Sequence, residues 1–490
     1  MSTWKCLLGL LLVPAMLGAR PFTIVAYNVE NLHDADGVAV YDDYQPSVYT
    51  RAHVLTKVRN IASVIARLSE GPGADIILFQ EIEIDQTPGK APPDYAAILK
   101  RYEGTTIDQM LGADFNPEIG DLPAEALLLK ACADKGLTGY TVVTGGDQSG
   151  KHEDGHGRAI KNVIFTRLPV KAVHTYQTLN ARNILEVQLD ADGYPLYVFD
   201  NHWKSGAGDL VTEEFRIENA RVLKKRIDEL LKADPNADII IGGDFNSHYN
   251  QKRRYRTMKE TAINDILGSQ GNELAVRGPT RDLYNLWFEL PPKERGSDLF
   301  KGQWGTLMSL IVSRGLYDMR GVQYVDNSFG VAKFPGLNAD DTGRPVRWNG
   351  KPAAGAGFSD HFPIYARFIT VADNQPGKFM PLLRTAGVDD DADKVDLKGT
   401  ALTVDKIPSG ANLRDGTWSG KLFRVEGKVV EDRYLKVSAY GDVYDVYSPD
   451  KEVRAALATQ KAGGQFKFYG ELGQYKGRWQ FVVQSIEWVK

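Results

Sequence analysis

The chain has 490 residues, which is too long for one hydrophobic core and predicts two domains. Apolar residues make up 43% of it and charged residues 25%, a composition that excludes a disordered protein. The net charge of −4 excludes a uniformly basic surface, so a nucleic-acid partner would need a local basic patch or a bound cation.

The first 19 residues have the pattern of a secretory signal peptide. Lys5 supplies the positive start, Cys6 to Leu17 are mostly apolar, and Gly18 and Ala19 offer a cleavage site. The apolar run is shorter than the roughly 20 residues of a spanning helix, so we expect export to the periplasm or the medium without a membrane anchor. After cleavage Cys132 is the only cysteine, which predicts a small buried side chain and no disulfide.

Residues 22–370 alternate short apolar runs with longer amphipathic stretches. The runs are rich in β-branched or aromatic residues and predict strands buried on both faces, and the stretches predict helices. This alternation favours a layered α/β domain. The strands are expected at Phe22–Tyr27, Ile76–Phe79, Tyr197–Phe199 and Asp238–Ile241, and the helices at Arg51–Leu68 and Thr212–Lys232.

Residues 371–399 are rich in proline and acidic residues and predict a linker. Residues 400–490 then predict a small all-β domain. Five strands with a helix between the third and the fourth follow the order of an OB-fold barrel. We expect these strands at Leu422–Val430, Tyr434–Val437, Val443–Tyr447, Phe466–Leu472 and Trp479–Ile486, with the helix at Lys451–Gln460.

Five polar motifs follow apolar runs in the first domain. Residues two apart in a strand point to the same side, so Asn28 with Glu30, His202 with Lys204, and Asp244 with Asn246 could each project from one strand end into one cleft. Carboxylates bind cations, imidazoles transfer protons and amides orient ligands, which together suit metal-assisted attack on a phosphodiester. Each motif alone is better explained as an ordinary turn or strand end. The motifs are Asn28-Val29-Glu30-Asn31, Gln80-Glu81, Asn201-His202-Trp203-Lys204, Gly243-Asp244-Phe245-Asn246 and Ser359-Asp360-His361.

Taken in this order, the motifs resemble the endonuclease/exonuclease/phosphatase superfamily, which has the DNase I-like fold. The segment from Tyr27 to Asp34 is most similar to the bacterial extracellular nucleases of that superfamily. The resemblance covers roughly residues 22 to 370 and implies a four-layered α/β sandwich with the active site at one end. It also implies a Mg²⁺ cofactor, with Mn²⁺ or Ca²⁺ as alternatives.

The resemblance implies a role for each motif residue. Glu81 would be the principal metal ligand, with Asn28 and Asp360 beside it. Asp244 and Asn246 would position the attacking water and the phosphate. The remaining predicted residues are the two imidazoles that flank the phosphate, His202 and His361, and two phosphate contacts, Lys204 and Arg158.

One position departs from the pattern of this superfamily. Its members usually carry an aspartate just before an Ile-Val-Ser strand, where it orients the last histidine. Here Met308 or Ser309 stands at that place. A histidine without its carboxylate loses orientation and basicity, so activity is reduced unless another acid such as Asp298 or Asp318 substitutes.

The C-terminal domain offers a second candidate surface. From Trp418 to Lys490 there are 12 Lys or Arg and 9 Asp or Glu, a balance of 12 − 9 = +3, and aromatic residues are dense. Exposed aromatics beside cations suit base stacking along a nucleic-acid strand. OB barrels also bind sugars and proteins, so this pattern does not fix the ligand. The residues predicted to bind here are Tyr440, Lys467, Tyr469 and Trp479.

The sequence therefore predicts an exported, metal-dependent nuclease that cleaves DNA or RNA, with no obligate protein partner. Three alternatives stay open. The first is a phosphoesterase acting on lipid or inositol phosphates, although no apolar hairpin for membrane entry is evident. The second is a weakened catalytic domain that only binds nucleic acid or mediates adhesion, as Met308 would permit. The third is a secreted structural or interaction protein in which the motifs arose by chance.

Overall fold

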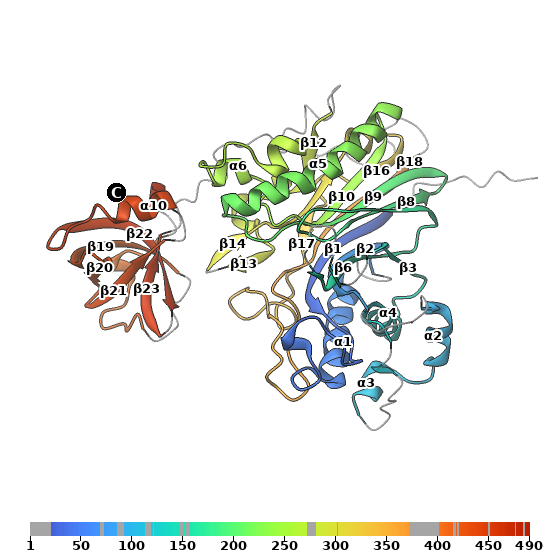
Figure 1. Ribbon diagram of the computed structural model, residues 1–490, viewed down its shortest axis with the longest axis horizontal. Helices are drawn as coiled ribbons and strands as arrows, with labels where there is room; N and C mark the ends of the chain where they lie inside the picture. Colours follow the sequence, from blue (N-terminus) through green and yellow to red (C-terminus); the bar gives the residue numbers. More distant parts are fainter. Residues whose placement is uncertain are drawn as a thin grey trace, which may run out of the picture.

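The protein is described here by a computed structural model (Figure 1). The predicted signal peptide, residues 372–399 of the predicted linker and Thr400 lie outside the described residues. Among those described, no helix is long and apolar enough to cross a membrane. The described residues are 21–68, 73–85, 93–112, 119–120, 122–147, 150–151, 157–271, 281–300, 302–371, 401–414, 418, 421–448, 451–475, 477–483 and 486–490.

Two seven-stranded sheets form the first domain. The first sheet is mixed, because β1 runs parallel to β2 but antiparallel to β18. In spatial order its strands are β16 (Gly321–Tyr324), β18 (Ile364–Val371), β1 (Pro21–Leu32), β2 (Ile76–Glu83), β6 (Ile160–Thr166) and β3 (Thr141–Thr144), with β17 (Gly330–Val331) paired to β18.

The second sheet is also mixed, because β9 and β10 are parallel whereas β15 runs antiparallel to β10. Its strands in spatial order are β11 (Ser269–Gln270), β12 (Leu283–Asn285), β15 (Met308–Val312), β10 (Asp238–Asp244), β9 (Tyr194–His202), β8 (Ile184–Ala191) and β7 (Val170–Tyr176). Two small hairpins lie outside both sheets, β4 (Gly150–Lys151) with β5 (Gly157–Arg158), and β13 (Asp298–Phe300) with β14 (Gln303–Gly305).

Helices cover the outer face of each sheet, so the domain has four layers (Figure 1). Alternation along β1 shows how the layers form: Ile24 and Ala26 pack between the sheets, whereas Val25 and Tyr27 pack under the helices. The α/β class expected from the sequence is confirmed. The helices are α1 (Arg51–Arg67), α2 (Tyr95–Arg101), α3 (Ile107–Met110) and α4 (Ala124–Asp134) over the first sheet, and α5 (Leu210–Ala233) over the second, with a short α6 (Gln251–Arg254).

Cys132 lies in α4 and is fully buried, as predicted. Burial raises the pKa of its thiol to about 12, since the apolar surroundings disfavour the thiolate. This cysteine is therefore a packing residue.

The predicted motifs meet at one edge of the sandwich. The carboxyl ends of the parallel pairs β1–β2 and β9–β10 carry the first four motifs as their last strand residues or the residues just beyond. The fifth motif was expected after a strand, but Ser359–His361 instead precedes β18. Because β18 is antiparallel to β1, its beginning lies at the same edge.

The last domain is a closed five-stranded barrel with the strand order β19-β20-β21-β23-β22, drawn in orange and red in Figure 1. All five predicted strands and the helix between the third and the fourth are present. Their bounds are β19 (Leu422–Glu431), β20 (Lys436–Ala439), β21 (Asp442–Tyr447), α10 (Lys451–Leu457), β22 (Gln465–Tyr475) and β23 (Arg478–Val482).

Candidate active site

Two carboxylates face each other across the gap between the sheets. The side-chain amide of Asn28 donates hydrogen bonds to Glu81 Oε1 and to Asp244 Oδ2, both at 3.0 Å. The amide oxygen of Asn28 accepts the backbone N–H of Glu30 at 2.9 Å, which fixes the orientation of the amide. In this arrangement Asn28 bridges the carboxylates with its nitrogen, whereas the predicted metal ligation would need its oxygen.

The backbone at this edge adopts unusual conformations that aim the side chains inward. Glu30, Asn31, Glu81 and Asn246 all have positive φ angles, between +47° and +67°, although none of them is glycine. Such residues cost roughly 1–3 kcal/mol each and cluster at functional sites. The strain is held in place by hydrogen bonds, such as the one that Asn31 N–H donates to Glu81 Oε2 at 2.8 Å.

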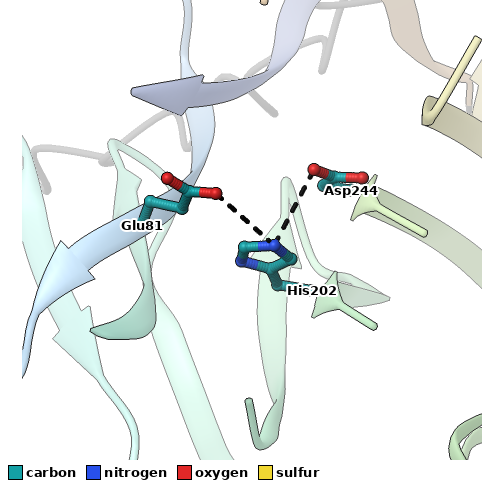
Figure 2. A group of neighbouring side chains, drawn as sticks. All are labelled: Glu81, His202 and Asp244. Atoms are coloured by element: carbon teal, nitrogen blue, oxygen red, sulfur yellow. Dashed lines mark ion pairs between the residues drawn. The ribbon is translucent and has the colours of Figure 1, made fainter. Parts of the chain in front are cut away.

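Two imidazoles complete the centre of the site. His202 Nε2 lies 3.6 Å from Glu81 Oε1 and 3.8 Å from Asp244 Oδ2, between the two carboxylates (Figure 2). His361 Nε2 lies 3.8 Å from Asp244 Oδ2 on the other side. The structure thus brings together the predicted histidines with Asn28, Glu81 and Asp244.

The two histidines have opposite electrostatic environments. Burial lowers the pKa of His202 well below its usual value, and nearby Arg182 and His361 lower it further. Burial also disfavours the charged form of His361, but the surrounding carboxylates, Asp360 first, outweigh this effect and raise its pKa to about 9. The surroundings thus favour the neutral form of His202 and the charged form of His361.

Asp360 lies at the mouth of the site rather than at its centre. Its carboxylate is 3.7 Å from His361 Nε2 and 3.4 Å from Arg347 Nη2. It is not part of the closest group of potential metal ligands, which consists of Glu81, His202 and Asp244.

Arg347 was missed by the sequence analysis. Its guanidinium donates two hydrogen bonds to Glu30 Oε1, at 2.8 and 3.2 Å, while the next residue donates its N–H to Glu30 Oε2. The side chain stays 64% exposed, so this cation is available to a ligand beside Asp360. No short motif marks Arg347, because a loop 317 residues after Glu30 delivers it.

Lys57, another missed residue, supports the strained turn from below. Its ammonium group is fully buried and donates hydrogen bonds to the backbone carbonyls of Glu30 and Asn31. Burial lowers its pKa to about 8, although the nearby carboxylates of the site raise it. Lys57 therefore positions the turn and does not face the cleft.

Two predicted site residues occupy other environments. Asn246 is mostly buried, and its amide donates to Trp203 O at 3.2 Å, so it ties the two strand ends together. Arg158 was predicted to contact phosphate, but it is only 6% exposed and donates to the carbonyls of Thr178 and Ala181. That prediction is corrected: Arg158 holds a neighbouring loop. Lys204 is half-buried just after β9, beside His202.

The barrel residues also differ from the prediction. Tyr469 is 1% exposed, with Lys490 Nζ 4.6 Å from its ring centroid, so no base can stack on it. Tyr440 and Trp479 are half-buried against the barrel core. Lys467 is exposed, but it pairs with Glu426 at 3.1 Å.

The donor set at the edge fits a divalent cation. Glu81 and Asp244 present hard carboxylate oxygens with the Asn28 amide and the His202 imidazole between them, and a cation would balance their charge. Oxygen ligands suit Mg²⁺, Mn²⁺ or Ca²⁺. The residues that could hold the ion are therefore the carboxylates of Glu81 and Asp244, with His202 and Asp360 near by.

Residues 160–370 match the model of the Endonuclease/Exonuclease/phosphatase family. No curated protein matches the sequence significantly.

Solved structures that are similar over about 70% of the chain share little sequence and align with low scores. They include truncated TDP2 from Caenorhabditis elegans (13% identity, TM-score 0.37, covering 71% of this chain and 98% of that one) and a mannosyl-6-phosphatase from Bacteroides thetaiotaomicron (15%, 0.36, 71% and 99%).

Proposed function

We propose that the protein is an exported, divalent-metal-dependent hydrolase that cleaves the phosphodiester bonds of DNA or RNA. The observation that carries the proposal is the meeting of Glu81, Asp244 and two imidazoles at one edge of the sandwich, within a chain that matches a phosphoesterase family. The apolar run after Lys5 supports export.

Each group has a role in hydrolysis by in-line attack of water. A bound divalent cation would polarise the phosphate and offset the charge that develops on it. Glu81 and Asp244 would hold this cation, while Asn28 keeps the two carboxylates together. The Nε2 atoms of His202 and His361 face the carboxylates from two sides, so they are the atoms that exchange protons with water and with the leaving oxygen.

We assign the barrel to the OB fold and to binding of the nucleic-acid strand. Its strand order, with a helix between the third and fourth strands, supports the fold assignment. Support for a nucleic-acid ligand comes from the exposed rings of Tyr434, Tyr447 and Tyr475 (68%, 41% and 56%).

A second candidate function is hydrolysis of lipid phosphates. The loop after β1 exposes Val38, Val40 and Tyr41 (45%, 48% and 39%), and Tyr41 lines an open pocket of about 640 Å³ together with Glu30 and Asn31 of the site. An apolar loop beside the site could touch a membrane surface. Asp42 and Asp43 line the same pocket and would repel anionic lipids, so nucleic acid stays the first proposal.

The deciding experiment compares circular plasmid, single-stranded RNA and sphingomyelin vesicles as substrates, each with Mg²⁺, Mn²⁺, Ca²⁺ or EDTA. Metal-dependent cutting of plasmid or RNA that disappears in Glu81→Ala is the expected result. Hydrolysis of the lipid alone would replace the first proposal by the second. DNA binding without turnover under every metal would indicate a binding module.

A further inference from the structure

His361 has an unused ring nitrogen on the side away from the cleft. Its Nε2 atom faces the carboxylates of the site, whereas its Nδ1 atom is buried and has no hydrogen-bond partner among the described residues. An imidazole that exchanges protons through one nitrogen is oriented by whatever the other nitrogen contacts. The groups around Nδ1 therefore determine how well the imidazole of His361 is oriented for proton exchange through Nε2.

Asp298 lies directly across from His361. The two residues form an isolated antiparallel β-bridge, and Phe362 N–H donates to Ser297 O at 2.6 Å in the same pairing. Residues directly opposite in an antiparallel pair have Cβ atoms roughly 4.5–5.5 Å apart on the same face. Both side chains are buried, with 6% and 8% exposed, and both come from this pairing.

The hairpin β13–β14 is built to hold this carboxylate. Asp298 Oδ1 accepts the N–H of Leu307 at 3.2 Å and the hydroxyl of Ser297 at 3.3 Å. Gly305 pairs with Asp298 across the hairpin, and a Cβ at Gly305 would lie 2.0 Å from Asp298 Oδ2. Glycine at this position thus leaves the space that the carboxylate occupies.

The other candidates for this role are excluded by their positions. Met308 pairs with Asp244 and is fully buried in the core between the sheets, but it carries no charge. The hydroxyl of Ser309 instead contacts Asn285 at 3.4 Å. Asp318 lies beyond the other end of β15, where its neighbours are Asp234, Arg314 and Arg320.

We infer that Asp298 is the positioning residue of the last histidine: in the substrate complex its carboxylate would accept the Nδ1–H of His361, a contact that the structure does not contain, and would fix the imidazole over the phosphate. The role that the superfamily usually gives to an acid at the place of Met308 is here carried by an acid ten residues earlier, on a separate hairpin. This inference rests on the proposed hydrolase function.

The test uses the full-length protein and isosteric variants. Asp298→Asn keeps an oxygen for the N–H of Leu307 but removes the charge. With bis(p-nitrophenyl) phosphate and Mn²⁺, we expect kcat to fall about 10- to 100-fold while KM stays within twofold. Asp318→Asn is the control and should match the wild type in both constants.

A second variant separates positioning from folding. Asp298→Asn combined with Met308→Asp returns a carboxylate beside Asp244, from the strand that pairs with it. Recovery of kcat in this double variant supports the inference even if Asp298→Asn melts at a lower temperature. The inference is overturned if Asp298→Asn keeps the wild-type kcat, or if its loss follows unfolding and the double variant regains nothing. A wild type without metal-dependent hydrolysis would instead refute the proposed function.

Discussion

The active-site edge and the barrel surface both carry many charges, but they arrange them in opposite ways. On the barrel, several exposed cations each have an acid beside them, as Lys467 has Glu426 and Arg414 has Asp442. At the edge, Glu81 and Asp244 are held against each other by one amide. Surface pairs of the first kind contribute little, whereas unbalanced buried charges are costly and point to a ligand. The contrast shows where function is concentrated.

The largest effect is expected from breaking the charge excess at the edge. Glu81→Gln removes one of the two facing carboxylates and should lower phosphodiester hydrolysis by about 10³-fold, because the cation and its charge stabilisation are lost. The measurement is kcat with saturating Mn²⁺, together with metal affinity by calorimetry. Glu229→Gln, on the exposed face of α5, is the matched control. Equal activity in the two variants would refute the assignment.

Next in size is a backbone change at the same edge. Gly243 has a φ of +122°, and a Cβ there would lie 2.1 Å from the carbonyl oxygen of Asn201. Gly243→Ala should therefore destabilise the sandwich by about 3 kcal/mol and displace Asp244. Thermal melting measures the loss. Gly473→Ala in the barrel has open space around the new methyl group and should melt like the wild type.

A smaller effect is expected from a charge change on the barrel, which tests whether this surface binds nucleic acid. Glu426→Gln releases Lys467 and Arg424 from their shared acid. If the barrel binds nucleic acid, this variant should bind a single-stranded oligonucleotide about 2- to 3-fold more tightly, with a steeper dependence on salt. Fluorescence anisotropy at several salt concentrations measures both. Unchanged affinity and slope would place the nucleic-acid contact elsewhere.

The last effect concerns a buried carboxylate at the start of β10, at the opposite end of that strand from Asp244. Asp238 begins β10, and burial raises its pKa well above the usual value, while the Val322 N–H lowers it and the nearby Asp318 and Asp234 raise it. Because the pKa of Asp238 is higher in the folded than in the unfolded state, its contribution to the free energy of unfolding is complete below about pH 4. This contribution declines as the pH rises. Asp238→Asn should flatten this decline by on the order of 1 kcal/mol per pH unit. Melting curves from pH 4 to pH 8 test it, and parallel curves for both proteins would contradict it.

The fold was largely predictable from the sequence because it follows from hydrophobic periodicity. The alternation of Ile24, Val25, Ala26 and Tyr27 already sorts side chains between two layers. The site was predictable where a motif sits on a strand end, since Glu81 and Asp244 are then fixed by their strands.

Tyr469 was predicted to bind a nucleic-acid strand, but its ring is buried, and the alternation of side chains along β22 shows why the sequence misled. Its neighbour Phe468 faces the barrel core, so alternation predicts an exposed ring at Tyr469. The chain end covers that outer face: Phe468 forms a bridge with Val489, and Lys490 lies over the ring. The sequence of one strand does not predict which distant segment of the chain will pack against it. Arg347 and Asp298 were not identified as certain site residues for the same reason.

The left-handed residues of the site have a consequence for how this sequence can change. Glu30, Asn31, Glu81 and Asn246 each occupy a conformation that glycine adopts without cost. Glycine at Asn31 would relax the turn and lose little packing, yet it would loosen the N–H that Asn31 donates to Glu81. Selection for stability alone would therefore replace these residues by glycine. In a variant library screened for activity, the positions that keep their original residue are those that the chemistry requires.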